Sequence, residues 1–533
     1  MALLPIIATP AAAQSPELMA AYRQYKMLSE QGRYAEAELF AREALKLGAT
    51  EFGPDHPNYA ILLNNMAVIH DGLRRYAAAE PLYKRALEIR EKALGPEHEL
   101  VGKTLARLAG LYFDQGRYTD AKPLLERSLA IQGSSLGPDH PKLAPLLHKL
   151  ATLYQRQGDD EEGAPLMERA LAIREKALGP RHRDVGESLI NLAKLHARQG
   201  RYDEAERLGK RALAIVKEVY GLDHPLVAIA LNNIAEIYRQ QGRLAEAEPL
   251  YERSLAIDEK ALGANHPSVA TTLNNLAALY YSQGRYSNAE PLYERSIAIV
   301  EVAFGPDHAS LAETLGNLGL LHKSQGRFGV AERLYDRSLA IAEKAYGPNH
   351  RMVGQSLRNL ADLYQTQGRY TEAEPLNKRS LAIAEKVDGP DHPTVGLALN
   401  NLAELYRHRG RYAEATPLYE RASVILEAAL GSDHAEVASA LNNQALNYTS
   451  QGRYDDAEPL YQRALESREK AFGPSHSSTG ITLNNLADLY QLQARYDEAR
   501  PLYERAIEIW EAALGPEHPR LGIAVNNLGL LHR

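Results

Sequence analysis

The sequence repeats itself with a fixed period of 42 residues. The histidine of segments such as "GPDHP" recurs at His56, His98, His140, His182, His224, His266, His308, His350, His392, His434, His476 and His518, and every interval is 42. The aromatic residue of "QGRY" follows the same step from Tyr34 to Tyr496, with departures at Asp160, Leu244 and Phe328. No insertion interrupts the period. One structural unit is therefore copied along the chain, and we expect a continuous array without internal domain boundaries.

Each unit has the pattern of two helices joined by a short turn. In residues 389–431, Gly389 and Pro390 end the previous helix, and Pro393 fits the first turn of the next one. Leucine, alanine and tyrosine residues follow at helical spacing until Gly410 breaks the helix. A second helix is expected from about Tyr412 to Leu430. The sequence therefore predicts an all-α protein of about twelve helix pairs.

Small residues recur where the two helices of a pair must approach closely. The first-helix position of Ala403 is Ala in ten of twelve units and Gly at Gly319 and Gly529. The second-helix position of Ala415 is Ala everywhere except Gly163. A single pair cannot bury both of its faces, so neighbouring pairs must stack into a continuous core.

The spacing of the small residue, the aromatic residue, Gly, Tyr and Ala within each unit resembles that of the tetratricopeptide repeat (TPR). The 42-residue period with "NNLAELY" and "GRYAEA" resembles the subclass found in kinesin light chains, over about residues 16–533. The resemblance implies a right-handed solenoid with terminal capping helices, whose first helices line an inner, concave wall that binds proteins or peptides. No heptad coiled coil precedes the repeats, so the motor-adaptor role of that family is not carried over, and a bacterial-type protein is expected.

The ends of the array and one internal unit depart from the repeat pattern. The last unit is incomplete and ends at "NNLGLLHR", either as a capping helix or because the chain is a fragment of a longer protein. In residues 157–167, "QGDDEEGAPLM", Asp160 replaces the aromatic and Gly163 replaces the close-packing alanine. We expect a soft joint in this segment.

The first residues, 1–15, resemble a leader. Residues 2–13 are apolar and end in an Ala-x-Ala pattern, which is typical of signal-peptide cleavage and predicts a cut after Ala13. The basic residues that usually begin such a leader are missing. We expect an exported or periplasmic protein, with a cytoplasmic protein as the alternative.

Paired asparagines in the first helices need an explanation, because asparagine is a poor helix former. The second residue of the pair is Asn in ten units, which together cost on the order of 6 kcal/mol of helix propensity. An amide side chain has both a donor and an acceptor. In the kinesin light chain group, the resemblance implies that this asparagine holds the backbone of an extended peptide. These residues define the predicted peptide-binding groove, and we name them the ladder asparagines: Asn65, Asn191, Asn233, Asn275, Asn317, Asn359, Asn401, Asn443, Asn485 and Asn527.

Two alternatives for the ladder asparagines stay open. Each amide could bond its counterpart in the next repeat, or the residues could have spread simply by duplication. The first residue of the pair, here named the leading asparagine, is Asn in seven units and is expected to make contacts between repeats.

Cations replace the ladder asparagine in two units. Arg107 and Lys149 occupy that site, Lys103 lies one turn before Arg107, and Lys194 lies on the next first helix. These four residues form a candidate pocket for a carboxylate, since charge-assisted bonds to carboxylates are strong. The alternative is ordinary solvated charge.

The remaining composition excludes several functions. The chain has 61 basic and 68 acidic residues, a net charge of −7, which gives no footprint for nucleic acid. It has no cysteine, no apolar stretch of about 20 residues that could span a membrane, and one histidine per unit in a loop rather than a cluster for a metal. We expect no cofactor and no enzymatic activity.

The expected function is therefore a scaffold that binds an extended peptide or protein segment in its concave groove. Two alternatives are a structural module that self-associates through its ends or outer face, and the regulatory repeat region of a larger effector protein.

Overall fold

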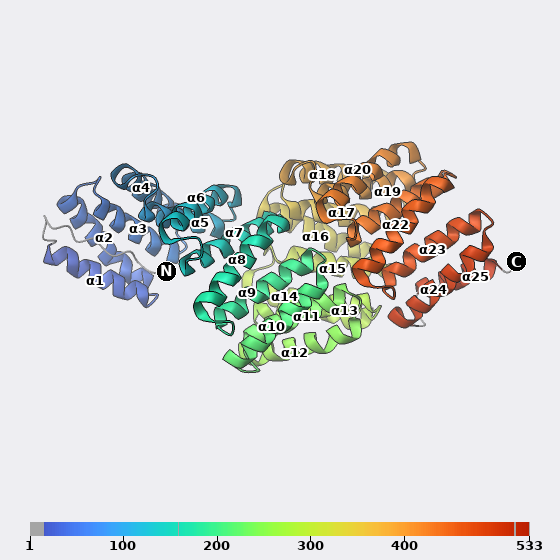
Figure 1. The fold of residues 1–533 in the computed structure, drawn as a ribbon, viewed down its shortest axis with the longest axis horizontal. Coiled ribbons are helices and arrows are strands. Elements are labelled where there is room, and N and C mark those ends of the chain that lie inside the picture. The colour runs from blue at the N-terminus through green and yellow to red at the C-terminus, as the bar shows by residue number, and fades with distance from the viewer. Residues whose placement is uncertain (1–14, 158, 516–518, 532–533) are drawn as a thin grey trace. The chain divides into compact units, whose positions relative to one another are not determined.

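The computed structural model describes residues 15–157, 159–515 and 519–531. In these ranges the regular structure is 25 α-helices and one short 3₁₀ helix, with no strand, so the predicted all-α helical-repeat fold is confirmed (Figure 1). Of the predicted leader, residues 1–15, all but Ser15 lie outside the described residues. None of the described helices is long and apolar enough to cross a membrane.

The chain divides into two compact units, Met1–Ser188 and Leu189–Arg533, here named unit 1 and unit 2. The division falls within helix α9 (Arg183–Arg198). In unit 1 the helices are α1 (Pro16–Glu30), α2 (Tyr34–Phe52), α3 (Pro57–Gly72), α4 (Tyr76–Leu94), α5 (Glu99–Asp114), α6 (Tyr118–Leu136), the 3₁₀ helix η1 (Pro141–Leu143), α7 (Ala144–Gln157) and α8 (Asp160–Leu178).

Unit 2 continues the alternation of first helices, which carry odd labels, and second helices, which carry even labels. They are α10 (Tyr202–Tyr220), α11 (Pro225–Gln240), α12 (Leu244–Leu262), α13 (Pro267–Ser282), α14 (Tyr286–Phe304), α15 (Leu311–Ser324), α16 (Phe328–Tyr346), α17 (Arg351–Thr366), α18 (Tyr370–Asp388), α19 (Pro393–His408), α20 (Tyr412–Leu430), α21 (Ala435–Ser450), α22 (Tyr454–Phe472), α23 (Ser477–Leu492), α24 (Tyr496–Leu514) and α25 (Pro519–Leu530).

Small and aromatic side chains fill the core as the repeat pattern predicts. Ala403 and Ala415 are fully buried, and so is Tyr419 on the second helix. Gly319 replaces alanine where a Cβ would lie 2.6 Å from the ring of Tyr335, too close for any side chain. Trp510 on α24 is 3% exposed and belongs to the core.

The periodic histidine has a definite role that the sequence did not reveal. Its Nδ1 atom accepts the backbone N–H two residues later, at 3.1 Å for His56 and 3.2 Å for His392. The same bond forms in all eleven units whose histidine is described, and His518 lies outside the described residues. The histidine therefore satisfies a donor that the first turn of a helix leaves unpaired, in the manner of an N-cap.

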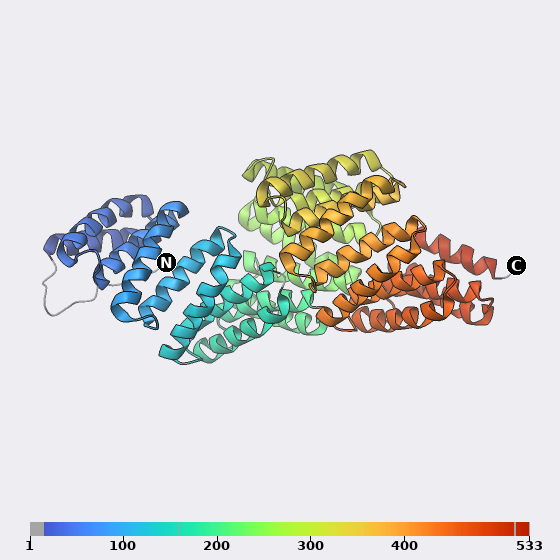
Figure 2. The same cartoon turned by 90° about the horizontal axis from the view of Figure 1, so that it is seen from above.

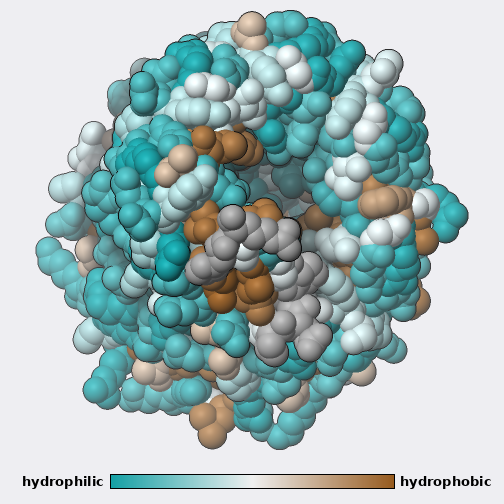
Figure 3. All heavy atoms as spheres, turned by 90° about the vertical axis from the view of Figure 1, so that its right-hand side faces the viewer, coloured by the Kyte–Doolittle hydropathy of each residue, from teal (hydrophilic) through white to brown (hydrophobic). Residues whose placement is uncertain are grey.

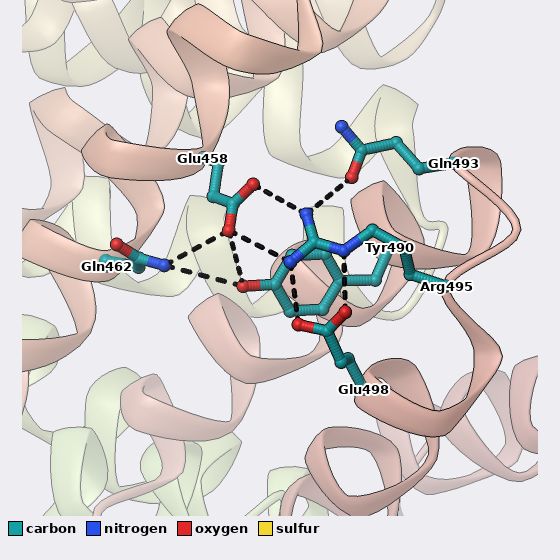
Figure 4. Close-up of polar contacts among 6 residues, drawn as sticks. All are labelled: Glu458, Gln462, Tyr490, Gln493, Arg495 and Glu498. Carbon is teal, nitrogen blue, oxygen red and sulfur yellow. Dashed lines mark hydrogen bonds and ion pairs between the residues drawn. The ribbon is translucent and has the colours of Figure 1, made fainter.

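A charged clamp joins successive repeats, and Figure 4 shows one example. The guanidinium of Arg495 lies over the ring of Tyr490, 4.0 Å from its centroid, and donates to the Glu458 carboxylate of the preceding repeat at 2.7 Å. It also donates to Glu498 on its own helix at 2.6 Å, while the hydroxyl of Tyr490 donates to Glu458 at 3.0 Å. Equivalent Arg–Glu bonds join Arg75 to Glu38, Arg117 to Glu80, Arg243 to Glu206, Arg285 to Glu248, Arg327 to Glu290, Arg369 to Glu332 and Arg411 to Glu374.

Candidate peptide-binding groove

The ladder asparagines lie on the first helices, from Asn65 on α3 to Asn527 on α25. In unit 2, neighbouring first helices contact one another directly, as α15 and α17 do. Asn65 is buried, whereas the other nine side chains are only half-buried. The first helices therefore form one continuous wall in unit 2 that keeps most of these amides within reach of solvent.

Four ladder asparagines bond the leading asparagine of the preceding repeat. Their Nδ2 atoms donate to the neighbour's Oδ1 atom across the repeat boundary. The pairs are Asn275 with Asn232 at 3.2 Å, Asn317 with Asn274 at 3.1 Å, Asn443 with Asn400 at 3.2 Å, and Asn485 with Asn442 at 3.1 Å. The paired motif "NN" therefore links repeats at these four boundaries, where four of the seven leading asparagines make the contacts between repeats that we expected of them.

Two ladder asparagines at the ends of the array have other partners. Asn65 donates to the hydroxyl of Tyr25 at 3.2 Å, inside the core of unit 1. Asn527 donates to Asp488 at 3.0 Å, and the leading asparagine Asn484 donates to the same carboxylate at 3.1 Å. Because all of these donors serve the protein itself, the ladder is in part structural.

Three ladder asparagines of unit 2 stand apart: Asn233, Asn359 and Asn401. The residue that would pair with each, 43 positions earlier, is Ile190, Gly316 or Arg358 instead of asparagine. A Cβ on Gly316 would lie 3.2 Å from the Nδ2 atom of Asn359, so that amide occupies the space beside a missing side chain. No hydrogen bond joins these three amides to another side chain or backbone group among the described residues. They are the amides most available to a ligand.

Charged side chains follow the ladder one turn further along the first helices of unit 2. Glu236 pairs with Arg239 at 2.6 Å and accepts the hydroxyl of Tyr251 at 2.7 Å. Lys323 on α15 pairs with Asp362 on the next first helix. On α19, Glu404 lies 4.0 Å from Arg407 and 3.8 Å from His408. The same wall therefore carries both signs of charge, already matched in pairs.

The pKa values of Glu404 and Asp488 are set by burial and by the groups around each carboxylate. Burial raises the pKa of Glu404, but His408, Arg407 and the more distant Lys323 outweigh burial, so its pKa lies below the usual value. Burial likewise raises the pKa of Asp488, and the hydroxyl of Tyr503 and the two asparagine amides offset this only in part, so its pKa stays above the usual value. Glu404 is thus charged at neutral pH, while Asp488 is a carboxylate held in place by neutral donors.

The four cations of the candidate acidic-ligand pocket are distributed over both units. Lys103 pairs with Glu99 on its own helix at 2.6 Å. Arg107 and Lys149 both lie near the buried Asp71, whose pKa is raised by burial and by Asp114 and lowered by these two cations. Lys194 is exposed on α9 and belongs to unit 2. In unit 1, three of the cations therefore already face carboxylates of the protein.

The histidines and carboxylates of the described chain do not gather into a metal site. Within residues 15–157, 159–515 and 519–531, no three His, Asp or Glu side chains converge as a metal site requires. The periodic histidines use one ring nitrogen as helix caps, which accounts for their regular spacing. Seen from the side of the C-terminus, the surface is mainly hydrophilic, and hydrophobic residues gather in the central hollow and in a few smaller groups (Figure 3).

Comparison with known proteins gives a consistent result. A family model described as "Tetratricopeptide repeat" matches residues 26–92, 100–176, 144–218, 184–260, 226–301, 268–344, 310–386, 353–423, 394–470, 436–509 and 478–533. No curated protein matches the chain.

Several solved structures are similar to parts of the chain. Two are crystal structures of putative kinesin light chain TPR-like repeats from Podosopora anserina, one of them a single-substitution variant. The variant is 30% identical and the other is 31% identical; they cover 39% of this chain and 97% and 99% of their own, and both have a TM-score of 0.34. A third, BtubC (BKLC) from P. vanneervenii, is 25% identical, covers 45% of this chain and 94% of its own, and has a TM-score of 0.35.

The family model thus covers nearly the whole described array. Only repeats of this kind were matched, and no catalytic domain is evident. The chain belongs to the tetratricopeptide repeat family.

Proposed function

We propose that this protein is a non-catalytic scaffold that binds an extended peptide or protein segment along the first helices of unit 2. Repeats of this family generally mediate protein–protein interactions. The observation that carries the proposal is the set of three amides, Asn233, Asn359 and Asn401, that are half-buried on this wall and lack the lateral bond of their equivalents.

The amide chemistry fits an extended backbone. Each free carboxamide has a donor and an acceptor, which match the C=O and N–H of a peptide unit. Asn359 and Asn401 lie on successive first helices, α17 and α19, which contact each other. They are therefore placed to hold successive segments of one guest, with the charged pairs nearby to favour particular side chains.

A peptide-display selection against the whole chain identifies ligands, and two double variants then test where they bind. Asn359→Ala with Asn401→Ala removes free amides and is expected to weaken binding roughly 10-fold or more, because two hydrogen bonds of about 1 kcal/mol are lost. Asn275→Ala with Asn317→Ala is the matched control, since those donors already serve the protein. Equal weakening by both double variants, or by neither, contradicts this location for the site.

A preference for acidic ligands is a separate part of the proposal. Arg107 and Lys149 share the neighbouring Asp71, and a ligand carboxylate would have to compete with that group. Arg107→Ala and Lys149→Ala should each reduce the enrichment of acidic peptides in the selection, and Asp71→Asn should increase it. An unchanged ranking of acidic peptides in all three variants rejects the pocket.

Self-association is the alternative function, and light scattering distinguishes it. A molar mass that rises with protein concentration, together with no peptide enriched above background, favours a structural module. A constant mass with enriched peptides favours the scaffold. Whether the array is fused to an effector domain is tested by the DNA sequence downstream of the codon for Arg533. An open reading frame that continues there supports a regulatory repeat region of a larger protein.

We also propose export, on the sequence of residues 2–13 alone. Expression of the full-length gene in a bacterial host followed by mass spectrometry of the periplasmic fraction tests it. A mature chain that starts at Gln14 supports export, and an intact N-terminus in the cytoplasmic fraction contradicts it.

A further inference from the structure

The second unit contacts itself between segments far apart in sequence. The ring of Tyr202, at the start of α10, stacks on Phe472, at the end of α22, with centroids 6.3 Å apart and ring planes 23° apart. Figures 1 and 2 show the first repeats of this unit, in green, beside the later ones, in orange. Successive turns of the helical array therefore touch within unit 2.

Two glycines make the same contact in consecutive repeats. Gly200 lies against His434, and a Cβ added to it would be 3.3 Å from the ring. Gly242 lies against His476 so closely that a Cβ would be 2.9 Å from Nε2 and nearer still to Cδ2. Both pairs are 234 residues apart, so the contact repeats in register with the 42-residue unit.

Tyr202 and Phe472 are both half-buried. At the position of Phe472, Phe304 and Tyr346 are 52% and 43% exposed, and at the position of Tyr202, Tyr496 is 50% exposed. Other equivalents, such as Tyr220 and Tyr454, are half-buried as well, so the contact is identified by the ring stacking and the glycine contacts rather than by burial.

One departure from the repeat pattern falls at the same place. Leu244 takes the position of the "QGRY" aromatic and lines a small cavity with Gly242 and Ser282. The opposite side of that cavity comes from the later turn, with Ser475, His476 and Ala513. Leu244 therefore lies at the contact between the two turns, as Tyr202 does one repeat earlier.

We propose that these contacts form a clasp, defined by Gly200, Tyr202, Gly242 and Leu244 on one turn and His434, Phe472 and His476 on the next, which closes the side of the unit 2 groove. The clasp is built from ring stacking and van der Waals contact, and no hydrogen bond joins its two sides among the described residues. Such a contact is weak enough to open, since one stacked aromatic pair contributes only about 1 kcal/mol beyond its buried area.

The clasp affects how a ligand reaches the groove, and this part of the inference rests on the proposed function. With the turns in contact, an extended segment reaches the ladder asparagines from an end of the unit or after the clasp opens. Opening and closing would then control entry of a folded or anchored partner more strongly than entry of a short free peptide.

The clasp itself is tested by a spin-label distance measurement. The chain has no native cysteine, so labels at Asp203→Cys and Ser432→Cys report only the separation of the two turns. We expect a single narrow distribution at short distance. It should broaden and lengthen in Tyr202→Ala/Phe472→Ala and remain unchanged in the matched control Tyr496→Ala/Phe304→Ala, whose rings are exposed. A broad distribution already present in the unsubstituted labelled protein overturns the proposal.

Lateral closure is tested without any peptide. A single cysteine at Ala278, one turn after Asn275 on α13, is labelled with a small maleimide and with a maleimide carrying a polyethylene glycol of about 5 kDa. Relative to an outer-surface cysteine at Glu252, the large reagent should react several-fold more slowly than the small one at 278, and the clasp variant should remove that difference. If the large and the small maleimide react at equal relative rates at residue 278 in the intact protein, the groove is not closed at its side. If closure is observed but the protein binds no peptide, only the scaffold function is contradicted.

Discussion

Asn317 donates its side-chain amide to Asn274 across 3.1 Å, and in doing so ties α15 to α13. The bond spans a repeat boundary, because the two residues are 43 positions apart. It explains why two poor helix formers persist side by side: the leading residue accepts from the next repeat, and the ladder residue donates to the previous one.

This relationship predicts opposite effects of the same substitution at two equivalent sites. Asn317→Ala gains about 0.6 kcal/mol of helix propensity but loses a bond of about 1 kcal/mol, so it should be neutral to slightly destabilising. Asn359→Ala has no lateral bond to lose and should stabilise by roughly 0.5 kcal/mol. Urea denaturation of both variants provides the measurement, and destabilisation by Asn359→Ala would show that its amide has a structural partner.

The inter-repeat clamp predicts that its arginines matter more than ordinary surface charges. Arg243 stacks on Tyr238 at 3.9 Å and bonds Glu206 of the preceding repeat at 2.6 Å. Arg243→Gln should lower the midpoint of thermal unfolding measurably. Arg33→Gln is the control, because among the described residues Arg33 bonds Glu36 and Gln31, both close to it in sequence, and no carboxylate of another repeat. A shift no larger than that of the control would mean that the clamp adds nothing beyond local pairing.

The histidine caps predict a loss of stability in acid. Burial, and then nearby Arg468, lowers the pKa of His476 from 6.5 to about 4, and burial also lowers the pKa of His434 and His350. The neutral ring, which accepts the N–H, is thus favoured by folding. Its contribution is fully present above pH 6.5 and is lost as pH falls toward 4, by up to about 3 kcal/mol for His476.

His476→Asn isolates this effect, because asparagine caps helices without titrating. The variant should lose less stability than the parent protein between pH 7 and pH 4 in chemical denaturation. Identical pH profiles for His476→Asn and the parent would exclude the cap as a source of acid sensitivity.

The segment 157–167 is predicted to be a soft joint of the array. Residue 158 lies outside the described residues, and Gly163 has no side chain where the other units carry alanine. Hydrogen-exchange mass spectrometry should show faster exchange at 157–167 than at the equivalent residues 199–209. Exchange at the same rate in the two segments would reject the joint.

The helix pairs follow from the sequence because glycine, proline and the small residues act locally and repeat without interruption. The glycine of Gly410 at a turn and the alanine of Ala403 at a close approach each recur in ten of the twelve units, so the period indicates the all-α stack. The position of the ladder asparagines on first helices also follows from the repeat.

The side-chain bonds could not be predicted in the same way. The partner of Asn317 is a residue of the previous unit, and only the packing of α13 against α15 brings the two amides together. Arg495 and Glu458 are linked over the same kind of distance in sequence, and the cap made by His56 depends on the rotamer of its ring. A residue that recurs in every repeat indicates that its position is important. Which side chain it bonds depends on how the neighbouring repeat packs against it.

The arginine clamp finally bears on how such a chain can lengthen or shorten. At eight junctions between repeats, a glutamate and an arginine at equivalent positions form the clamp. Duplication or deletion of a whole unit at one of these junctions therefore places a glutamate opposite an arginine again. The seam between Thr416 and Arg453 is different, since the hydroxyl of Thr416 accepts from Asn447 at 3.0 Å and Gln451 at 3.3 Å in place of a carboxylate. The equivalent pairs Lys122 with Asp159 and Ala164 with Arg201 also depart from the clamp, so the gain or loss of a whole unit keeps the seam intact only at the eight junctions that share it.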